Sequence, residues 1–230
     1  MTPGEFRLRV TWVKAGRLRW LSHLEVLHAL ERVIRRSKLE YAVTHGFSPH
    51  MKIAFGPALP VGTAGQTEYA DVWLTRYTGA DEALEALRKA APADLEPIGA
   101  QYVGDRVPSL TAALTIALYR VELVGGELGE DHVRRVVLEL MRRGELHIEQ
   151  KGKTKAFDLA VCIPKDPSVS VEEGSVVVEL PVRMGPHGSL RPEVFIRAAL
   201  AASGAEVSAI RTTRTDLLIE SEDGSWQRPV

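Results

Sequence analysis

Two histidines, a phenylalanine and a lysine lie close together between Thr44 and Lys52, and side chains of these types could bind or cleave RNA. The sequence Thr-His-Gly-Phe-Ser-Pro-His-Met-Lys places them at His45, Phe47, His50 and Lys52. Gly46 permits a positive φ and Pro49 fixes the next turn, so we expect an ordered loop. An exposed phenylalanine can stack on an unpaired base while neighbouring cations contact phosphate. The alternative is that the phenylalanine packs into the core and the histidines bond to backbone carbonyls.

Three arginines precede this loop on one predicted helix, at Arg32, Arg35 and Arg36. Residues three and four apart lie on the same side of a helix, so these cations share a face. We expect folding to bring them and the loop together as one exposed, electropositive concavity that binds RNA. A basic face that is only solvated is the alternative. The lysine-rich tip 151–155 is a second basic segment, and it adds Lys153 and Lys155 to the predicted RNA contacts.

The charge of the chain is unevenly distributed although its net charge is only −1. Residues 1–60 hold ten Lys or Arg and four Asp or Glu, a balance of +6, together with four of the seven histidines. Residues 61–130 hold five against eleven, a balance of −6. A local excess of cations can attract phosphate even when the whole molecule is nearly neutral. Alternatively, the two segments neutralise each other in the fold.

Motifs of common enzyme classes are missing from the sequence. It has no Walker loop, no GxGxxG after a strand, no GxSxG and no HExxH. His23 and His28 are five residues apart, about 140° around a helix, which prevents them from sharing a metal ion. The one cysteine, Cys162, is predicted to be a buried, inert thiol within a strand. We expect no metal, no cofactor and, outside one nuclease hypothesis, no enzyme activity.

The alternation of apolar and polar residues predicts two halves with the same order of elements. In the first half, residues 6–13 read as a half-buried strand with Arg7 and Arg9 on its polar side. Ser22 and Glu25 form a capping box for a helix whose apolar stripe is Leu24, Leu27, Leu30 and Ile34. The remaining predicted elements are strands over 41–44 and 68–75, a helix over 81–90 and a strand over 95–103.

The second half repeats this pattern without repeating the sequence. Its predicted elements are a strand over 114–124, a helix over 131–143, segments 146–150 and 157–163 around the lysine tip, a strand over 176–182, a helix from Pro192 to Gly204 and a strand within 207–219. The order predicts an α+β fold of two tandem ferredoxin-like (βαββαβ) domains with antiparallel sheets, over 1–104 and 114–220. Residues 104–113 are the expected linker, and residues 221–230 a flexible tail.

Composition is that of an ordinary globular protein, with 45% hydrophobic and 26% charged residues in 230. A single cysteine fits a reducing compartment, although it does not prove one. The sequence begins without an apolar run of the signal-peptide type, and no stretch approaches the roughly 18 apolar residues that span a bilayer. We expect a soluble, cytoplasmic protein.

Several short motifs resemble those of the bacterial radical-SAM-linked protein family, a domain of unknown function found alone or fused to radical SAM proteins. They are Arg-Trp-Leu-Ser-His-Leu-Glu over 19–25, Arg-Val-Ile-Arg-Arg over 32–36, Gly-Phe-Ser-Pro-His-Met-Lys-Ile over 46–53, Gly-Pro-Ala-Leu-Pro-Val-Gly over 56–62, and Glu68-Tyr69. The resemblance is strongest over residues 5–75. It implies an accessory role beside a radical SAM enzyme that modifies RNA or a ribosomal component. The chain lacks a CxxxCxxC motif, so that enzyme would be a separate chain.

Three hypotheses follow from these observations. The favoured one is an RNA-binding accessory protein without catalysis. The second is a metal-independent endoribonuclease, with His45 or His50 as general acid or base and Lys52 stabilising the transition state; the doubled ferredoxin-like order resembles CRISPR repeat-processing endoribonucleases, although their terminal glycine-rich loop is not evident here. The third is a protein-docking module that does not bind nucleic acid, with the acidic segment 61–130 as its contact surface.

Overall fold

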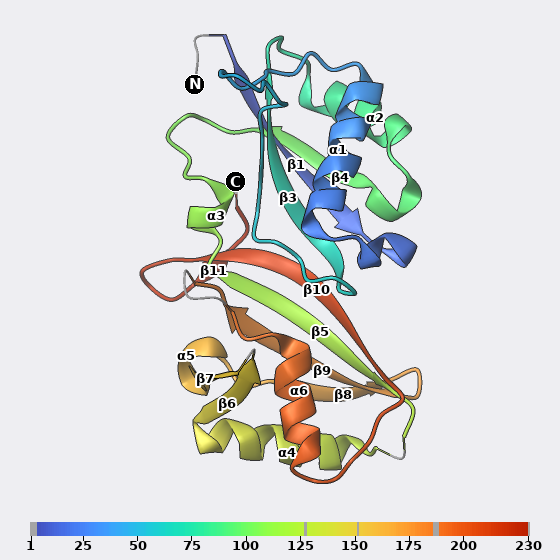
Figure 1. The fold of residues 1–230 in the computed structure, drawn as a ribbon, viewed down its shortest axis with the longest axis vertical. Helices are drawn as coiled ribbons and strands as arrows, with labels where there is room; N and C mark the ends of the chain where they lie inside the picture. Colours follow the sequence, from blue (N-terminus) through green and yellow to red (C-terminus); the bar gives the residue numbers. More distant parts are fainter. Residues whose placement is uncertain (1–3, 127, 151, 186–188, 230) are drawn as a thin grey trace. The chain divides into compact units, whose positions relative to one another are not determined.

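The computed structural model describes residues 4–126, 128–150, 152–185 and 189–229 (Figure 1). The chain divides into two compact units, Met1–Leu114 with Arg228–Val230, and Thr115–Gln227, which we call unit 1 and unit 2. Each unit holds helices and antiparallel pairs of strands, so the fold belongs to the α+β class. In the part of the chain that the structure describes, no helix has the length and apolar character needed to cross a membrane.

Unit 1 is built on a sheet with the strand order β4-β1-β3, and β2 pairs with β3. All of these pairs are antiparallel. The strands are β1 (Phe6–Lys14), β2 (Ile53–Phe55), β3 (Ala64–Leu74) and β4 (Pro97–Tyr102). The helices are α1 (His23–Ser37), α2 (Ala80–Ala90) and α3 (Leu110–Ala113), with short 3-10 turns η1 (Gly16–Trp20) and η2 (Ala93–Leu95).

One face of this sheet forms the apolar core with α1 and α2. Alternate residues of β1 and β3 turn toward the helices, and their buried side chains join those of both helices in one cluster, which includes Leu8, Val10, Val33, Ile34, Val72, Leu74 and Leu87. The apolar stripe expected on α1 is wrong at its first position, because Leu24 is 65% exposed. The helix instead buries Val26, Leu30, Val33 and Ile34, which follow one another at helical spacing.

The other face of β1 is also buried, although the sequence predicted a half-buried strand with this face exposed to solvent. Arg7 and Arg9 are only 7% and 2% exposed, and both bind the fully buried carboxylate of Asp71 on β3. The Nε atoms of the two arginines donate to Asp71 at 2.9 and 2.8 Å. Arg7 also donates to the carbonyls of Val107 and Pro108 at 2.7 and 3.0 Å. The segment expected as a linker therefore packs against this face and ends in the short helix α3.

The strand expected over 41–44 is interrupted in the structure. Tyr41 forms an isolated bridge with Leu74, and the regular pairing with β3 resumes at Ile53–Phe55 as β2. Between them the chain leaves the sheet, because Lys52 N donates to Ala42 O and Val43 bridges Met51. Two segments, Tyr41 and β2, thus pair with the same edge of β3, and the residues between them form a loop that leaves the sheet.

The strands of unit 2 pair in the order β10-β5-β9-β8, and β11 pairs with β10. All of these pairs are antiparallel. These strands are β5 (Ile116–Val124), β8 (Ser168–Glu172), β9 (Ser175–Arg183), β10 (Ala209–Glu220) and β11 (Trp226–Gln227). A separate hairpin consists of β6 (Glu145–Gln150) and β7 (Lys153–Asp158). The helices are α4 (Glu130–Arg143), α5 (Leu159–Cys162) and α6 (Pro192–Ala201).

Unit 2 differs from the sequence prediction in several places. Residues 157–163 do not form one strand, because the Asp158 side chain accepts from Val161 N and starts α5. Cys162 consequently ends a helix, half-buried, and burial raises the pKa of its thiol, which does not favour a nucleophile. Strand β8 was not expected. The presumed tail includes β11, where Lys165 Nζ lies 3.7 Å from the centroid of the Trp226 ring.

Candidate nucleic-acid interface

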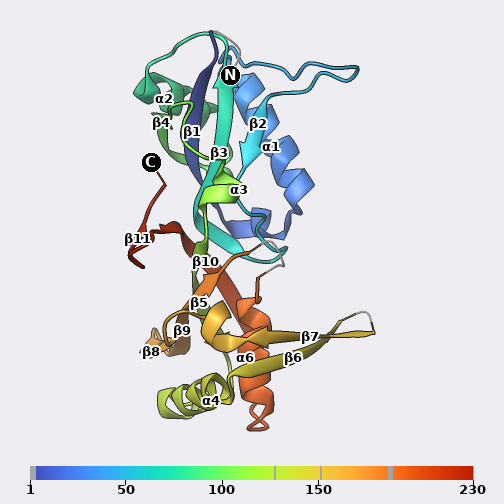
Figure 2. The ribbon, with the colours of Figure 1, turned by 90° about the vertical axis from the view of Figure 1, so that its left-hand side faces the viewer.

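The chain between β3's two partner segments forms a hairpin, residues 43–51, which we call the histidine hairpin. Thr44 N donates to His50 O at 2.8 Å, and His50 N donates to the Thr44 side chain at 3.2 Å. Gly46, at φ 141°, takes the positive φ that the sequence suggested. Figure 2 shows this light-blue segment projecting from unit 1 well beyond β2 and α1. The loop is therefore an ordered projection from unit 1.

The tip of the histidine hairpin is fully accessible. Phe47 is 110% exposed, and every residue from His45 to His50 is exposed. The alternative in which Phe47 packs into the core is therefore wrong. A ring at this position has both faces available for stacking, and the apolar surface it leaves in water is of the kind that marks a contact site.

His50 has a defined environment although it is exposed. Its Nδ1 atom lies 3.0 Å from the carbonyl oxygen of Ser48 and 3.3 Å from the Thr44 hydroxyl. A ring nitrogen next to a carbonyl oxygen carries the proton, and in the neutral ring this leaves Nε2 as an acceptor. His50 could thus accept a proton or a hydrogen bond through Nε2.

Lys52 does not join the exposed set. Its Nζ lies 2.6 Å from the Glu5 carboxylate and 5.2 Å from the centroid of the Trp73 ring. The Arg7 guanidinium lies 5.6 Å from the same ring centroid. This lysine therefore anchors the base of the histidine hairpin on the sheet, and its charge is balanced locally.

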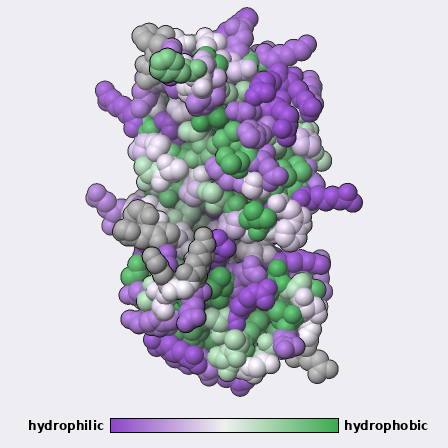
Figure 3. All heavy atoms as spheres, viewed as in Figure 1, coloured by the Kyte–Doolittle hydropathy of each residue, from purple (hydrophilic) through white to green (hydrophobic). Residues whose placement is uncertain are grey.

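The three predicted arginines lie on the outward side of α1 and are exposed. Arg35 is paired with Glu31 one turn earlier at 3.0 Å. Among the described residues, no carboxylate lies within 4.0 Å of Arg32 or Arg36. His28 is exposed one turn before Arg32. Hydrophilic side chains cover this part of unit 1 in Figure 3, over α1 and α2.

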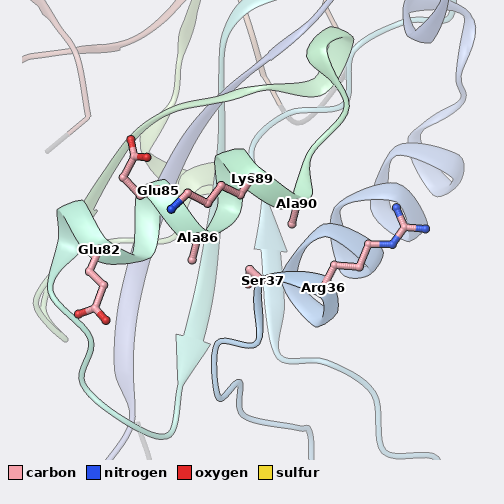
Figure 4. Close-up of a pocket in the computed structure, with 7 residues that line it drawn as sticks. All are labelled: Arg36, Ser37, Glu82, Glu85, Ala86, Lys89 and Ala90. Atoms are coloured by element: carbon pink, nitrogen blue, oxygen red, sulfur yellow. The ribbon is translucent and has the colours of Figure 1, made fainter.

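The arginines do not line an electropositive concavity, contrary to our expectation. A shallow hollow of about 600 Å³ between α1 and α2 is lined in part by Ser37, Ala86 and Ala90. Its charged lining residues are two glutamates and two cations: Glu82, Glu85, Lys89 and Arg36. Figure 4 shows Arg36 pointing away from α2, toward the outer side of α1. The positive surface is therefore a helix face beside a projecting hairpin.

The second predicted basic segment belongs to unit 2 and is described separately from the surface of unit 1. Lys155 on β7 is exposed, and its Nζ lies 4.6 Å from the centroid of the Phe157 ring. Lys153 belongs to the same strand, but its side chain and the whole of Lys151 lie outside the described residues.

Sequence reasoning missed two exposed aromatic side chains, Trp20 and Tyr77, which are 64% and 60% exposed. Trp20 ends η1, two residues before the N-cap of α1. The signal that could have indicated Trp20 is an aromatic residue two positions before the N-cap Ser22. No group of three or more His, Cys, Asp or Glu side chains in the described parts of the chain could hold a metal ion.

Comparison with known proteins gives a family and weak structural likenesses. The model of a family described as "Uncharacterized protein conserved in bacteria (DUF2344)" matches residues 7–192. No curated protein matches the chain. A chain of the Cbf5-Nop10-Gar1 complex is 16% identical with a TM-score of 0.45, over 90% of this chain and 48% of that one, so this protein spans about half its length. An unknown protein from Galdieria sulphuraria is 11% identical with a TM-score of 0.23, over 90% and 98% of the two chains. These likenesses support no conclusion about fold or function.

Proposed function

The chain belongs to the DUF2344 family of uncharacterized proteins conserved in bacteria, and on that premise we propose that it is a cytoplasmic RNA-binding protein that presents RNA to a partner enzyme. The proposal rests on one observation above all, the fully exposed Phe47 ring on an ordered hairpin. Exposure of a phenyl ring to water is unfavourable, so a partner that covers the ring would bind with a favourable contribution from the buried apolar surface.

Neighbouring side chains favour RNA as that partner. His45 and His50 flank the ring in the hairpin, and Arg32 and Arg36 present exposed guanidinium groups on α1. Stacking of an unpaired base on the ring, with phosphate contacts from the arginines, is how single strands are bound without strict sequence preference. Bases are accessible in this way only when unpaired, so the proposed ligand is single-stranded RNA.

The test measures binding of a fluorescent 12-nucleotide oligouridylate by anisotropy at low salt. Phe47→Ala and Phe47→Leu should both weaken binding by roughly five- to hundredfold, since base–aromatic stacking contributes about 1–3 kcal/mol. Leucine keeps an apolar side chain without a ring, so it separates stacking from burial. Val171→Ala removes an exposed apolar side chain of unit 2 and serves as the control. The proposal fails if no binding is detected or if Phe47→Ala leaves affinity unchanged.

A metal-independent endoribonuclease is the second candidate, and the environment of His50 favours it. Its Nε2 could take the proton of a ribose 2′-hydroxyl, whose oxygen attacks the adjacent phosphorus while a protonated histidine, such as His45, gives a proton to the departing 5′-oxygen. The hypothesis also needs a cation at the phosphate, and Lys52 is already paired with Glu5. Cleavage of labelled RNA in EDTA that disappears in His45→Ala/His50→Ala would establish this activity.

The partner and the finer fold are also proposals. The motifs within residues 19–62 that resemble the radical-SAM-linked family support a separate radical SAM enzyme as the partner. We also propose that both halves, 1–104 and 114–220, are ferredoxin-like domains. The strand orders β4-β1-β3 with β2, and β10-β5-β9-β8, support this, since both are fully antiparallel with two main helices each.

A further inference from the structure

Trp20 is held in a fixed position although most of its side chain is exposed. Gly62 N donates to Arg19 O at 2.9 Å, and Arg19 Nε donates to Gly62 O at 3.1 Å, which ties η1 to the segment before β3. Gly62 has φ +86°, and a Cβ atom there would come within 2.9 Å of the indole. The indole thus packs directly on the glycine backbone. An aromatic ring that is braced by backbone and remains 64% exposed needs little ordering when it binds a flat group.

One cation lies beside this indole, and a second follows from the adjacent sequence. The Arg19 guanidinium lies 5.6 Å from the ring centroid, and the neighbouring Arg17 is exposed. Among the described residues, no carboxylate lies within 4.0 Å of the guanidinium of either arginine. A ligand that fits this arrangement has a flat group to stack on the indole and a negative charge next to it for the arginine. A nucleotide has both, in its base and its phosphate.

Helix α1 connects this aromatic site to the histidine hairpin. Trp20 precedes its first turn, while the hairpin leaves unit 1 near the end where α1 finishes, as Figures 1 and 2 show. His28 and Arg32 are exposed on the helix between them. Its 15 residues span about 22 Å at 1.5 Å per residue. At the roughly 3.4 Å spacing of stacked nucleotides, this corresponds to about seven nucleotides.

We infer that Trp20 is a second base-stacking residue, and that the RNA ligand is a single strand of at least about seven nucleotides that follows α1 from Phe47 to Trp20. This inference rests on the proposed function, because it extends the same surface. It assigns Arg17 and Arg19 to the phosphates at the Trp20 end and Arg32 and Arg36 to those near the hairpin.

The test compares a 12-nucleotide with a 4-nucleotide oligouridylate on the full chain. Trp20→Ala should weaken binding of the 12-mer at least about fivefold and leave binding of the 4-mer, which is too short to reach both rings, unaffected. Phe47→Ala should weaken binding of both. Trp20→Phe should restore most of the lost affinity, and Val61→Ala, which shortens an exposed apolar neighbour, is the matched control. Equal unfolding midpoints of the variants would show that the fold is intact.

A second readout uses tryptophan emission. Of the four tryptophans, Trp12 is only 4% exposed and Trp73 and Trp226 are half-buried, whereas Trp20 is 64% exposed. Quenching by the bound 12-mer should therefore fall most in Trp20→Phe. If RNA binding depends on Phe47 but Trp20→Ala changes neither affinity nor quenching, the inference is overturned. The exposed indole would then be a contact for a protein. If RNA does not bind the wild-type protein at all, the proposed function fails first.

Discussion

Asp71 shows how strongly a single residue can constrain this fold. Its carboxylate is fully buried and accepts hydrogen bonds from Arg7 and Arg9, which are themselves almost fully buried. Removing charged groups from water costs several kcal/mol each, and the mutual attraction of the three groups offsets that cost only while all are present. Arg7 also holds the carbonyls of Val107 and Pro108, so the same cluster fixes the segment that leads to α3.

Asp71→Ala should therefore destabilise the protein by about 3 kcal/mol or more, because it leaves two guanidinium groups buried without their shared carboxylate. Urea unfolding followed by circular dichroism measures this. Asp105→Ala, at an exposed aspartate of the same unit, should change stability by less than about 0.5 kcal/mol. Equal stability of the two variants would contradict the assigned role of Asp71.

The residues of this cluster illustrate a limit of sequence reasoning. The alternation of apolar and polar residues in β1 correctly predicted which residues share a face, but it predicted that Arg7 and Arg9 would be exposed to solvent. Their partner is more than sixty positions away and meets them only through the register of β1 with β3. Phe47 was easier to predict, because Gly46 and Pro49 constrain the backbone locally and the consequence, an ordered loop, needs no distant partner.

At the scale of elements, the start of α1 is well determined by its own sequence. Ser22 accepts from Glu25 N at 3.4 Å, and Glu25 accepts from Ser22 N at 2.8 Å, so the expected capping box is confirmed. The hydrogen bonds from the Ser22 side chain and backbone lower the pKa of Glu25 below its ordinary value of 4.5. These bonds are stronger to the ionised carboxylate than to the protonated group, so their contribution to stability depends on pH.

The sign of the pH effect follows from this lowered pKa. Because the folded pKa lies below the unfolded one, the stabilisation by Glu25 is fully present above pH 4.5 and is lost as the pH falls through the folded pKa. Glu25→Gln should therefore be less stable than the wild type at neutral pH, and the difference should shrink on acidification. Urea unfolding at several pH values tests this. A difference that stays constant from pH 7 to pH 3 would contradict the prediction.

Other elements could not be predicted because their pairing is not local. Tyr41 and Ile53 share β3 as a partner across an excursion of the chain. Alternation alone cannot show that one edge position is occupied by two segments. In unit 2, β6 and β7 form a separate two-stranded sheet among the described residues, while β8 takes the edge position beside β9. Long helices such as α4 were predictable, since their period is carried by contiguous residues.

At the scale of the whole molecule, the excess of +6 in residues 1–60 overstates the surface that can attract RNA. Arg7 and Arg9 are buried with Asp71, Lys52 is paired with Glu5, and Arg35 is paired with Glu31. Lys14 is 1% exposed and donates to Leu21 O. Half of the ten cations are thus used within the fold. Composition measures charge, whereas binding depends on the charge that remains accessible.

Because few cations remain accessible, we expect the affinity for RNA to depend only weakly on salt concentration, and this dependence to come from particular arginines. For single strands, the logarithm of the binding constant falls by about 0.7 per phosphate contact for each tenfold rise in salt. If Arg32 and Arg36 each contact a phosphate, Arg32→Gln/Arg36→Gln should make the slope for the 12-nucleotide oligouridylate shallower by about 1.4. Anisotropy titrations at several salt concentrations measure this.

The matched control lies at the end of α4 in unit 2. Arg142 and Arg143 are exposed in the last turn of that helix, as Arg35 and Arg36 are in the last turn of α1. Arg142→Gln/Arg143→Gln removes the same charge from the molecule, so a specific surface on unit 1 predicts an unchanged slope. Equal slopes in the two double variants would mean that RNA responds to net charge alone. The basic face of α1 would then have no particular role.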